Sequence, residues 1–304
     1  MARLAGTGML GLYLFMASWG CTSSPRIEST VQDSGGGGVA TPLDSATIGN
    51  PYLRAGGIGV TDLEKASEFL IQVLGMTQEG PDVTREDRVE RTFWAKAVNR
   101  GSRVVLMKFS DGRNTQNITA KIVFEAPDVQ ATYSAAVNAG YPSILSPVSL
   151  GSVLVSQVKG PEGYTVEILN GLDDGGAGAT MPYFIALAFG VSDLAASEKF
   201  YGDGFGMKQT VPYSDSDLVE QTMEYPTGGG GGLVLQHYNK TMHNYRDNPV
   251  KHVSYVPDVN AFVAQVSGAG GTIVQPPAAM PAYDGKLGAV MNDLDGYIIE
   301  LVQE

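Results

Sequence analysis

The sequence predicts an α+β fold with two tandem domains, each built from two βαβββ modules that form a curved, mostly antiparallel sheet with the helices outside. Three observations carry this prediction. Short motifs recur along the chain at a nearly constant spacing, segments with strand and helix periodicity follow one another in the same order in each copy, and a glycine-rich segment separates the copies. The two copies are expected to pack as an internal pseudo-dimer.

Four motifs recur at offsets of 130 to 133 residues, which is difficult to obtain by chance. Each copy has an Asp-Leu start of a helix, a Gly-Met end of that helix, a Pro-Asp-Val start of a second helix, and a Gly-Tyr turn followed by a glutamate. In the first copy the motifs are Val60-Thr61-Asp62-Leu63, Gly75-Met76, Pro127-Asp128-Val129 and Gly163-Tyr164 with Glu167; in the second they are Val191-Ser192-Asp193-Leu194, Gly206-Met207, Pro257-Asp258-Val259 and Gly296-Tyr297 with Glu300.

Each motif delimits a predicted element. Small and apolar residues alternate over 54–60, which predicts a strand. Asp62 is expected to cap a helix whose apolar stripe runs from Leu63 to Leu74, and Gly75 to end it. Asp128 is expected to start a second helix in the same way, ending at Gly140. Further strands are expected at 91–98, 103–109, 121–126, 152–158 and 164–169, and the second copy repeats this order with helices near 194–201 and 259–267.

The first 21 residues are predicted to be a targeting segment. Arg3 is a minimal positive region, residues 4–17 are apolar, and Ser18-Trp19-Gly20-Cys21 follows. This pattern resembles a bacterial lipoprotein signal in which Cys21 is lipidated; an ordinary secretory signal with an incidental cysteine is the alternative. The protein is therefore expected outside the cytoplasm, anchored to a bacterial membrane through Cys21, or secreted if Cys21 is not lipidated.

Composition sets the remaining boundaries and excludes some partners. The formal net charge of -12 argues against nucleic acid and against an anionic membrane surface, because both require a basic footprint. Segment 22–51 is rich in Gly and Ser and has no apolar period, so it is predicted to be a flexible tether. The predicted folded units are a first domain at 52–170, a linker at 171–181 and a second domain at 182–304.

Taken together, the four motifs resemble the vicinal oxygen chelate superfamily, which includes glyoxalase I, bleomycin-resistance proteins and extradiol dioxygenases. The resemblance covers residues 52–304 and implies two glyoxalase-like domains. In metal-dependent members it implies a divalent metal held by a final-strand glutamate and first-strand histidines, with a middle-strand carboxylate in some. Here Glu167 and Glu300 match the glutamates, but the histidine positions hold Ala55, Lys121, Ala186 and Lys251, and the middle-strand position falls near Leu106 and near Leu235 or Gln236.

The substitutions are the same in both copies and suggest a different partner for each glutamate. Strand alternation places lysine and glutamate on one concave face, so we expect Lys121 to pair with Glu167 and Lys251 with Glu300 in a ligand cup, with no metal or other cofactor. Such pairs either only neutralise a buried carboxylate or also offer a cation to an anionic or carbonyl-bearing ligand. A nucleophilic role is opposed by the glutamate, which favours the charged ammonium.

The alternative to a metal-free cup is a rearranged divalent-metal site formed by His237, His252 and Glu300. Because His252 follows Lys251, alternation favours a buried structural histidine that faces the helices. The orientation of His237 depends on strand register, and His243 lies in a predicted loop. Four tyrosines either line an apolar cup for a flat ligand or pack in the core or at the rim: Tyr238, Tyr245, Tyr255 and Tyr283.

These observations predict a protein that binds a small molecule in its cups without a metal, as bleomycin-resistance members of the resembled family do. If the protein is an enzyme, a glyoxalase-like lyase or isomerase, or an extradiol-type dioxygenase with rearranged metal ligands, is expected. The third hypothesis is a structural or interaction module of the cell envelope whose cups are filled.

Overall fold

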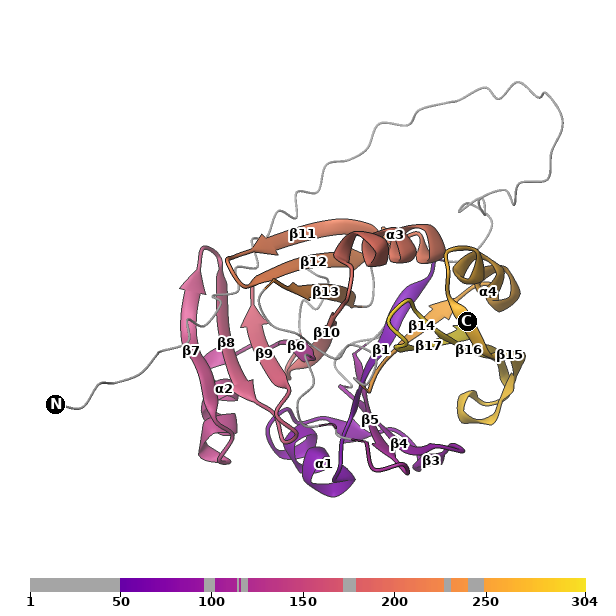
Figure 1. Ribbon diagram of the computed structural model, residues 1–304. Coiled ribbons are helices and arrows are strands. Elements are labelled where there is room, and N and C mark those ends of the chain that lie inside the picture. Colours follow the sequence, from indigo (N-terminus) through magenta and orange to yellow (C-terminus); the bar gives the residue numbers. More distant parts are fainter. Residues whose placement is uncertain are drawn as a thin grey trace, which may run out of the picture.

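The structure is a computed structural model that describes residues 50–95, 102–113, 115, 120–171, 179–226, 231–239 and 249–304 (Figure 1). These residues form two curved sheets and four α-helices. None of the helices in these ranges is long and apolar enough to cross a membrane. The predicted signal segment with Cys21, most of the tether and the loop with His243 lie outside the described residues.

Sheet A combines strands from both ends of the described chain. Its strands are β1 (Tyr52–Gly59), β2 (Thr77–Gln78), β3 (Val83–Thr84), β4 (Arg88–Trp94), β5 (Arg103–Phe109), β14 (Val250–Val256), β15 (Thr272–Met280), β16 (Lys286–Asn292) and β17 (Ile298–Gln303). Their order is β15-β16-β17-β14-β1-β5-β4-β2, with β3 also paired to β4. The central pair β1–β14 is antiparallel, and its flanking pairs β1–β5 and β14–β17 are parallel.

Sheet B has the same plan and is built from the middle of the chain. Its strands are β6 (Lys121–Glu125), β7 (Ser143–Leu150), β8 (Val153–Lys159), β9 (Thr165–Asn170), β10 (Tyr183–Gly190), β11 (Lys208–Ser214), β12 (Leu218–Glu224) and β13 (Gly232–Tyr238). Their order is β11-β12-β13-β10-β6-β9-β8-β7. As in sheet A, the central pair β10–β6 is antiparallel and its flanking pairs β10–β13 and β6–β9 are parallel.

The predicted α+β class and the curved, mostly antiparallel sheets are confirmed, but the modules pair differently from the expectation. The sequence suggested that the two modules within 52–170 share one sheet and the two within 182–304 share the other. Instead, the first module pairs with the fourth through β1 and β14, and the second pairs with the third through β6 and β10. The central strands of all four modules have similar apolar sequences, so strand pattern alone does not select the partner.

The helices begin where the aspartates of the repeated motifs predict. They are α1 (Leu63–Gln72), α2 (Val129–Asn138), α3 (Leu194–Phe205) and α4 (Val259–Gly268), and each is preceded by an Asp whose side chain accepts from a backbone N–H of the first turn. α1 and α4 pack on sheet A, α2 and α3 pack on sheet B, and α3 also packs against α4. The helices therefore cover the outer faces and leave the concave faces to other side chains.

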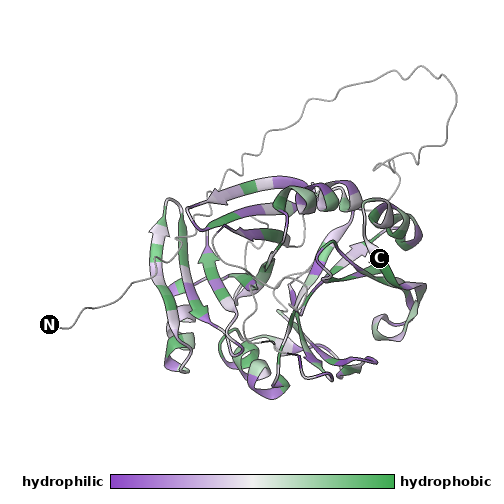
Figure 2. Cartoon of the chain, in the orientation of Figure 1, coloured by the Kyte–Doolittle hydropathy of each residue, from purple (hydrophilic) through white to green (hydrophobic). Residues whose placement is uncertain are grey.

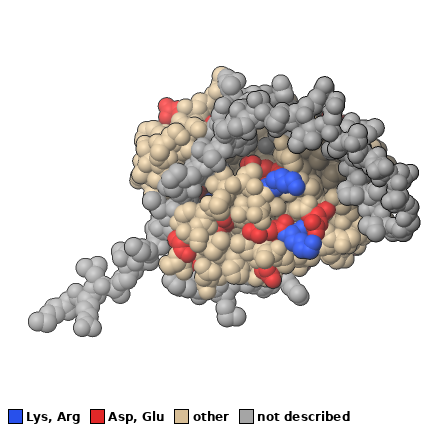
Figure 3. Space-filling model, turned by 90° about the horizontal axis from the view of Figure 1, so that it is seen from above, with Lys and Arg blue, Asp and Glu red and all other residues tan. Residues whose placement is uncertain are grey.

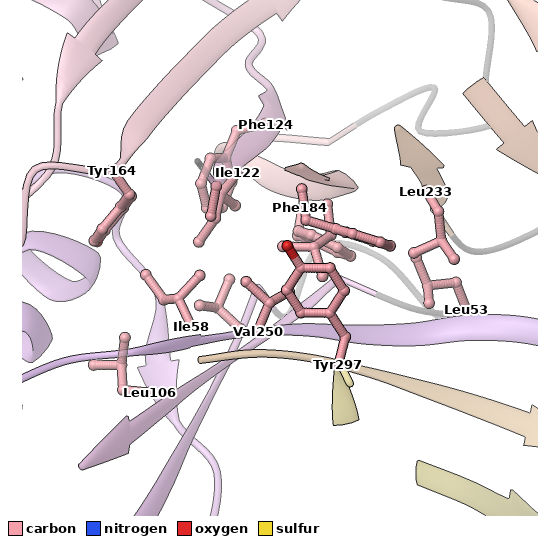
Figure 4. Close-up of a cluster of buried hydrophobic side chains, with 14 of the residues drawn as sticks. Leu53, Ile58, Leu106, Ile122, Phe124, Tyr164, Phe184, Leu233, Val250 and Tyr297 are labelled. Atoms are coloured by element: carbon pink, nitrogen blue, oxygen red, sulfur yellow. The ribbon is translucent and has the colours of Figure 1, made fainter. Parts of the chain in front are cut away.

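One continuous apolar core joins the two sheets. Figure 4 shows Leu53, Ile58 and Val250 of sheet A close to Phe124 and Phe184 of sheet B. Each concave face carries a separate apolar cluster, as expected for strands whose residues alternate between two faces. Figure 2 shows the hydrophobic and hydrophilic residues interspersed along the strands. The concave faces are therefore chemically separate from the central core.

Five strands were not predicted from the sequence: β2 and β3 have only two residues each, and the three longer strands, β7, β11 and β15, lie at sheet edges. Each of these three contains proline: Pro147 in β7, Pro212 in β11, and Pro276 with Pro277 in β15. The strand register shifts near each of these prolines. Proline has no N–H for a ladder and is tolerated at an edge or bulge, so the same residues that lowered the strand signal also identify the edges.

The two Gly-Tyr turns link each sheet to a helix of the other sheet. Glu162, in the turn before β9, accepts from Thr61 Oγ1 at 2.9 Å and from Thr115 Oγ1 at 3.1 Å, next to the start of α1. Asp295, in the turn before β17, accepts from the backbone N–H of Ser192 at 3.1 Å, next to the start of α3. The turns therefore hold the first module on the second and the third on the fourth.

Candidate functional site

Cup A, the concave face of sheet A, has a buried lysine between two carboxylates at its centre. Lys251 Nζ lies 2.8 Å from Glu90 Oε2 and 3.1 Å from Glu300 Oε2. The lysine comes from β14, Glu300 from the parallel neighbour β17, and Glu90 from β4. The exposed fractions are 1% for Lys251 and 0% for Glu300, so the charges are removed from water and neutralise one another.

Two side chains from outside the central strands complete cup A. Arg85, in the turn between β3 and β4, places Nη2 2.8 Å from Glu300 Oε1. Tyr283, in a short 3₁₀ helix (Pro281–Tyr283) between β15 and β16, donates its hydroxyl to Glu300 Oε2 at 2.6 Å. Arg88 Nε lies 2.6 Å from Glu90 Oε1. Arg85 comes from near one edge of sheet A and Tyr283 from near the other edge, and both contact Glu300. We call this pair of contacts across the cup the clasp.

Cup B, the concave face of sheet B, repeats the lysine and the two carboxylates with different neighbours. Lys121 Nζ lies 3.4 Å from Glu167 Oε2 and 3.3 Å from Glu220 Oε1. Gln157 Nε2 donates to Glu167 Oε2 at 2.6 Å, and Gln236 Nε2 donates to Glu220 Oε1. The other oxygen of Glu167 is buried and has no hydrogen-bond partner among the described residues. The contacts of Lys121 are longer than those of Lys251.

Small residues on the central strands β1 and β10 leave space for the side chains of the lysines on the neighbouring strands. A Cβ atom added at Gly57 of β1 would lie 3.1 Å from the Cβ of Lys251 and 3.4 Å from that of Val105. Gly57 and Lys251 are directly opposite in the β1–β14 ladder, as Ala188 and Lys121 are in the β10–β6 ladder. The space beside these small residues is therefore occupied in part by the lysine side chains.

The equivalent glutamates Glu90 and Glu220 have opposite pKa shifts. Burial raises the pKa of Glu90, but the charges of Lys251 and Arg88 outweigh burial and lower this pKa to about 2. In cup B, burial raises the pKa of Glu220, and the single cation Lys121 does not offset it. Burial alone would lower the pKa of Lys121, but Glu167 and Glu220 raise it. Lys121 is thus held as an ammonium, which opposes a nucleophilic role.

The residues present in the cups do not fit the metal site of metal-dependent relatives. Within the described ranges, no three His, Cys, Asp or Glu residues are grouped so that they could hold a metal ion. Each cup does have a middle-strand carboxylate, Glu90 or Glu220, but it belongs to β4 or β12, whereas the positions that the sequence analysis indicated, Leu106 and Leu235 or Gln236, lie on the adjacent strands β5 and β13. Their shared offset of 130 residues was the signal that would have identified them.

The structure does not bring His237, His252 and Glu300 together. His252 faces away from cup A, packs against Tyr201 and Phe205 of α3, and is 1% exposed. Burial lowers the pKa of His252 to about 3. His237, on β13 of the other sheet, lies with Nδ1 3.1 Å from the carbonyl oxygen of Val191. The rearranged metal site is therefore not formed, and His252 lies where strand alternation placed it.

The tyrosines proposed as a lining do not form one group. Tyr255 and Tyr283 lie together in cup A, with ring centroids 6.3 Å apart. Tyr238 ends β13 in sheet B, and Tyr245 lies outside the described residues. Tyr52, which was not proposed, also belongs to cup A, with its ring 5.6 Å from Tyr255. The aromatic lining is thus a property of cup A.

Comparisons with known proteins agree with this architecture. Residues 52–168 and 184–301 match the family model of the Glyoxalase/Bleomycin resistance protein/Dioxygenase superfamily. The crystal structure of glyoxalase I from Zea mays superposes with a TM-score of 0.65 at 18% sequence identity, covering 83% of this chain and 92% of that chain. A proposed dioxygenase from Bacillus subtilis gives a TM-score of 0.59 at 10% identity, covering 83% and 84%. At such identities these structures show the fold alone. No curated protein matches the sequence.

Proposed function

Because the chain belongs to the Glyoxalase/Bleomycin resistance protein/Dioxygenase superfamily, we propose that it is a membrane-tethered, extracytoplasmic protein that binds a small molecule in its cups without a metal. The observation that carries this proposal is the lysine between two carboxylates in each cup. Lys251 lies within hydrogen-bond distance of Glu90 and Glu300, and Lys121 contacts Glu220 and Glu167. An ammonium in this position supplies the positive charge that carboxylates otherwise obtain from a divalent cation.

Metal content tests the proposal directly. The purified full-length protein is incubated with Mn²⁺, Ni²⁺ or Zn²⁺ and desalted, and its metal content is measured by inductively coupled plasma mass spectrometry. We expect far less than one ion per chain, and no difference between the wild type and Glu300→Ala. One divalent ion per chain that is lost in Glu300→Ala would refute the metal-free cup.

The membrane tether rests on the sequence of the first 21 residues. We expect the wild-type protein in the membrane fraction and labelled by a fatty-acid analogue, and Cys21→Ala to lose the label. Equal labelling of both proteins would show that Cys21 is not the lipidation site.

The visible Lys and Arg side chains in Figure 3 lie next to Asp and Glu side chains, so the described residues form no broad basic patch on that face.

A structural module of the envelope is the second candidate, because the lysines and glutamates at the cup centres are at most 5% exposed. In that case the charged groups only hold the sheets together, and no small molecule enters. The two functions differ in one measurement: a ligand stabilises a binding protein against heat by an amount that rises with the logarithm of the ligand concentration above the Kd, whereas a filled module is not stabilised.

A further inference from the structure

The concave side of sheet A carries an excess of positive charge, although the whole protein has a net charge of -12. Among the described residues, the ion pairs of this face connect five cations with four carboxylates, and a further cation, Lys286, lies 5.4 Å from the ring of Tyr255. The five paired cations are Arg54, Arg85, Arg88, Arg103 and Lys251, and the carboxylates are Glu79, Asp87, Glu90 and Glu300. Among the described residues, the central ion pairs of cup B have the opposite balance, because they connect Lys121 with Glu167 and Glu220.

The difference between the cups arises at equivalent positions of one hairpin. The backbone N–H of Arg85 donates to the carbonyl of Arg88 at 2.7 Å, and that of Asp215 donates to the carbonyl of Leu218 at 2.9 Å. Arg85 and Arg88 precede Glu90 in the chain at the same spacing at which Asp215 and Leu218 precede Glu220. Cup A therefore has two guanidinium groups where cup B has a carboxylate and a leucine, while the lysine and glutamates below them are the same.

The apolar walls of the cups differ as well. Cup A is aromatic: Arg54 lies over the ring of Tyr255 at 4.5 Å, Arg88 lies 5.9 Å from the ring of Phe109, and Tyr283 packs edge-on against Tyr255. The described apolar cluster of cup B is aliphatic, with Val, Leu, Ile and Ala side chains. Arginine and aromatic side chains together favour a flat ligand with an anionic group, because the guanidinium pairs with the anion and the rings pack on its plane.

We propose that cup A, and not cup B, binds a flat organic monoanion, an aromatic carboxylate, whose carboxylate group pairs with Arg85 and Arg88 while its ring packs against Tyr255 and Tyr283. This inference rests on the proposed small-molecule function and specifies its ligand class. The carboxylate matches the planar guanidinium fork, and its negative charge complements the cations on this face. A phosphate group has no flat ring that could pack against the tyrosines.

The geometry also indicates how the ligand gains entry. Arg85 Nη2 and the Tyr283 hydroxyl hold Glu300 at 2.8 Å and 2.6 Å and come from separate connections. Arg85 Nε is buried, makes no hydrogen bond among the described residues and lies 3.6 Å from Glu90 Oε2, so the guanidinium group of Arg85 contacts both carboxylates at the centre of cup A. Arg85 keeps an exposed fraction of 19% in its side chain, which places it between the cup and solvent. Opening the clasp and pairing Arg85 with the ligand exchanges one carboxylate for another.

The test uses the full-length protein in neutral detergent and four probes of similar size or charge: benzoate, benzamide, benzylamine and inorganic phosphate. Calorimetry gives the Kd, and tryptophan fluorescence gives the location, because Trp94 lies in cup A and the other tryptophan is Trp19 in the signal segment. We expect benzoate to bind at least tenfold more tightly than the other three and to change the fluorescence. Arg85→Gln should weaken benzoate binding at least tenfold, and the matched variant Asp215→Asn less than twofold.

The outcomes separate this inference from the function on which it rests. Benzamide, benzylamine or phosphate binding as tightly as benzoate, or an unchanged Kd for benzoate in Arg85→Gln, would overturn the anion site while leaving a small-molecule binding protein. No binding by any of the four would overturn the anion site, and the absence of thermal stabilisation by a wider set of neutral and charged ligands would overturn the function as well. The comparison of benzoate with benzamide on the wild type decides the question even if Arg85→Gln does not fold.

Discussion

Replacing His252 by phenylalanine should make the protein less sensitive to acid. The imidazole is 1% exposed, its ring centroid is 5.5 Å from that of Phe205, and neither ring nitrogen has a hydrogen-bond partner among the described residues. Burial lowers its pKa to about 3, whereas a histidine in an unfolded chain titrates near 6.5. Below pH 6.5 the unfolded state therefore binds a proton that the folded state excludes.

The sign and size of the effect follow from proton linkage. The contribution of His252 to stability is fully present above about pH 6.5 and is lost as the pH falls towards 3, at about 1.4 kcal/mol per pH unit. Between pH 7 and pH 5 the loss is about 2 kcal/mol, because pH 5 lies 1.5 units below the unfolded pKa. The phenylalanine side chain has no titrating group, so His252→Phe should lose about 2 kcal/mol less than the wild type over this range.

The assay is urea unfolding at pH 7, 6 and 5, followed by circular dichroism. His237→Gln is the matched control, because its ring is partly exposed and keeps a polar contact with the carbonyl of Val191. We expect its pH dependence to equal that of the wild type within error. Parallel pH profiles for the wild type and His252→Phe would refute the neutral buried histidine.

Three further predictions concern stability and are also measured by urea unfolding at pH 7. Lys251→Met leaves Glu90 and Glu300 without their shared ammonium and should cost about 3 kcal/mol, part of which Lys251→Met combined with Glu300→Gln should restore; equal stability of both variants would contradict the ion cluster. Glu162→Ala removes the acceptor for Thr61 and Thr115 and should cost about 1–3 kcal/mol, whereas Glu64→Ala, 77% exposed, should cost about 0.5 kcal/mol or less. Gly59→Ala would bring a Cβ within 2.2 Å of Pro249 and should cost about 1–3 kcal/mol, while Gly268→Ala, with no atom near its added Cβ, should be neutral or stabilising. If Glu162→Ala and Glu64→Ala, or Gly59→Ala and Gly268→Ala, changed the free energy of unfolding equally, the local contact would not be the cause of the destabilisation.

The local structure was predictable wherever one residue determines it. Asp62, Asp128, Asp193 and Asp258 each cap a helix, because a short acceptor side chain satisfies the free N–H groups of the first turn. The pairs Lys121–Glu167 and Lys251–Glu300 were predictable for a related reason: alternation along parallel neighbouring strands places both side chains on the same face. Whether these pairs act in ligand binding stays a prediction.

The other site residues and the pairing of modules depend on contacts between residues far apart in the sequence, which the apolar pattern of the strands does not reveal. Glu90 and Glu220 occupy strands whose partners are set by sheet order, so their proximity to the lysines required the pairing of modules. Arg85 reaches Glu300 from a hairpin in which the other copy has Asp215, and Tyr283 reaches it from a connection that is longer than its counterpart between β7 and β8, so no repeated residue marks either contact. The sequence also contains no signal that selects the first-with-fourth pairing of modules, because each central strand could pair with any of the others.

This nested pairing constrains the order in which the protein assembles. The strands of sheet B follow one another from β6 to β13, whereas β1 must wait for β14, about 200 residues later in the chain. Closing so long a loop is slow when the intervening segment is unfolded and much easier when that segment is already compact. Sheet B therefore acts as a folded insert that brings the two halves of sheet A together. Cup A is complete only after β17, the last strand, has joined sheet A. A chain that ends before β17 would therefore keep cup B and lose cup A.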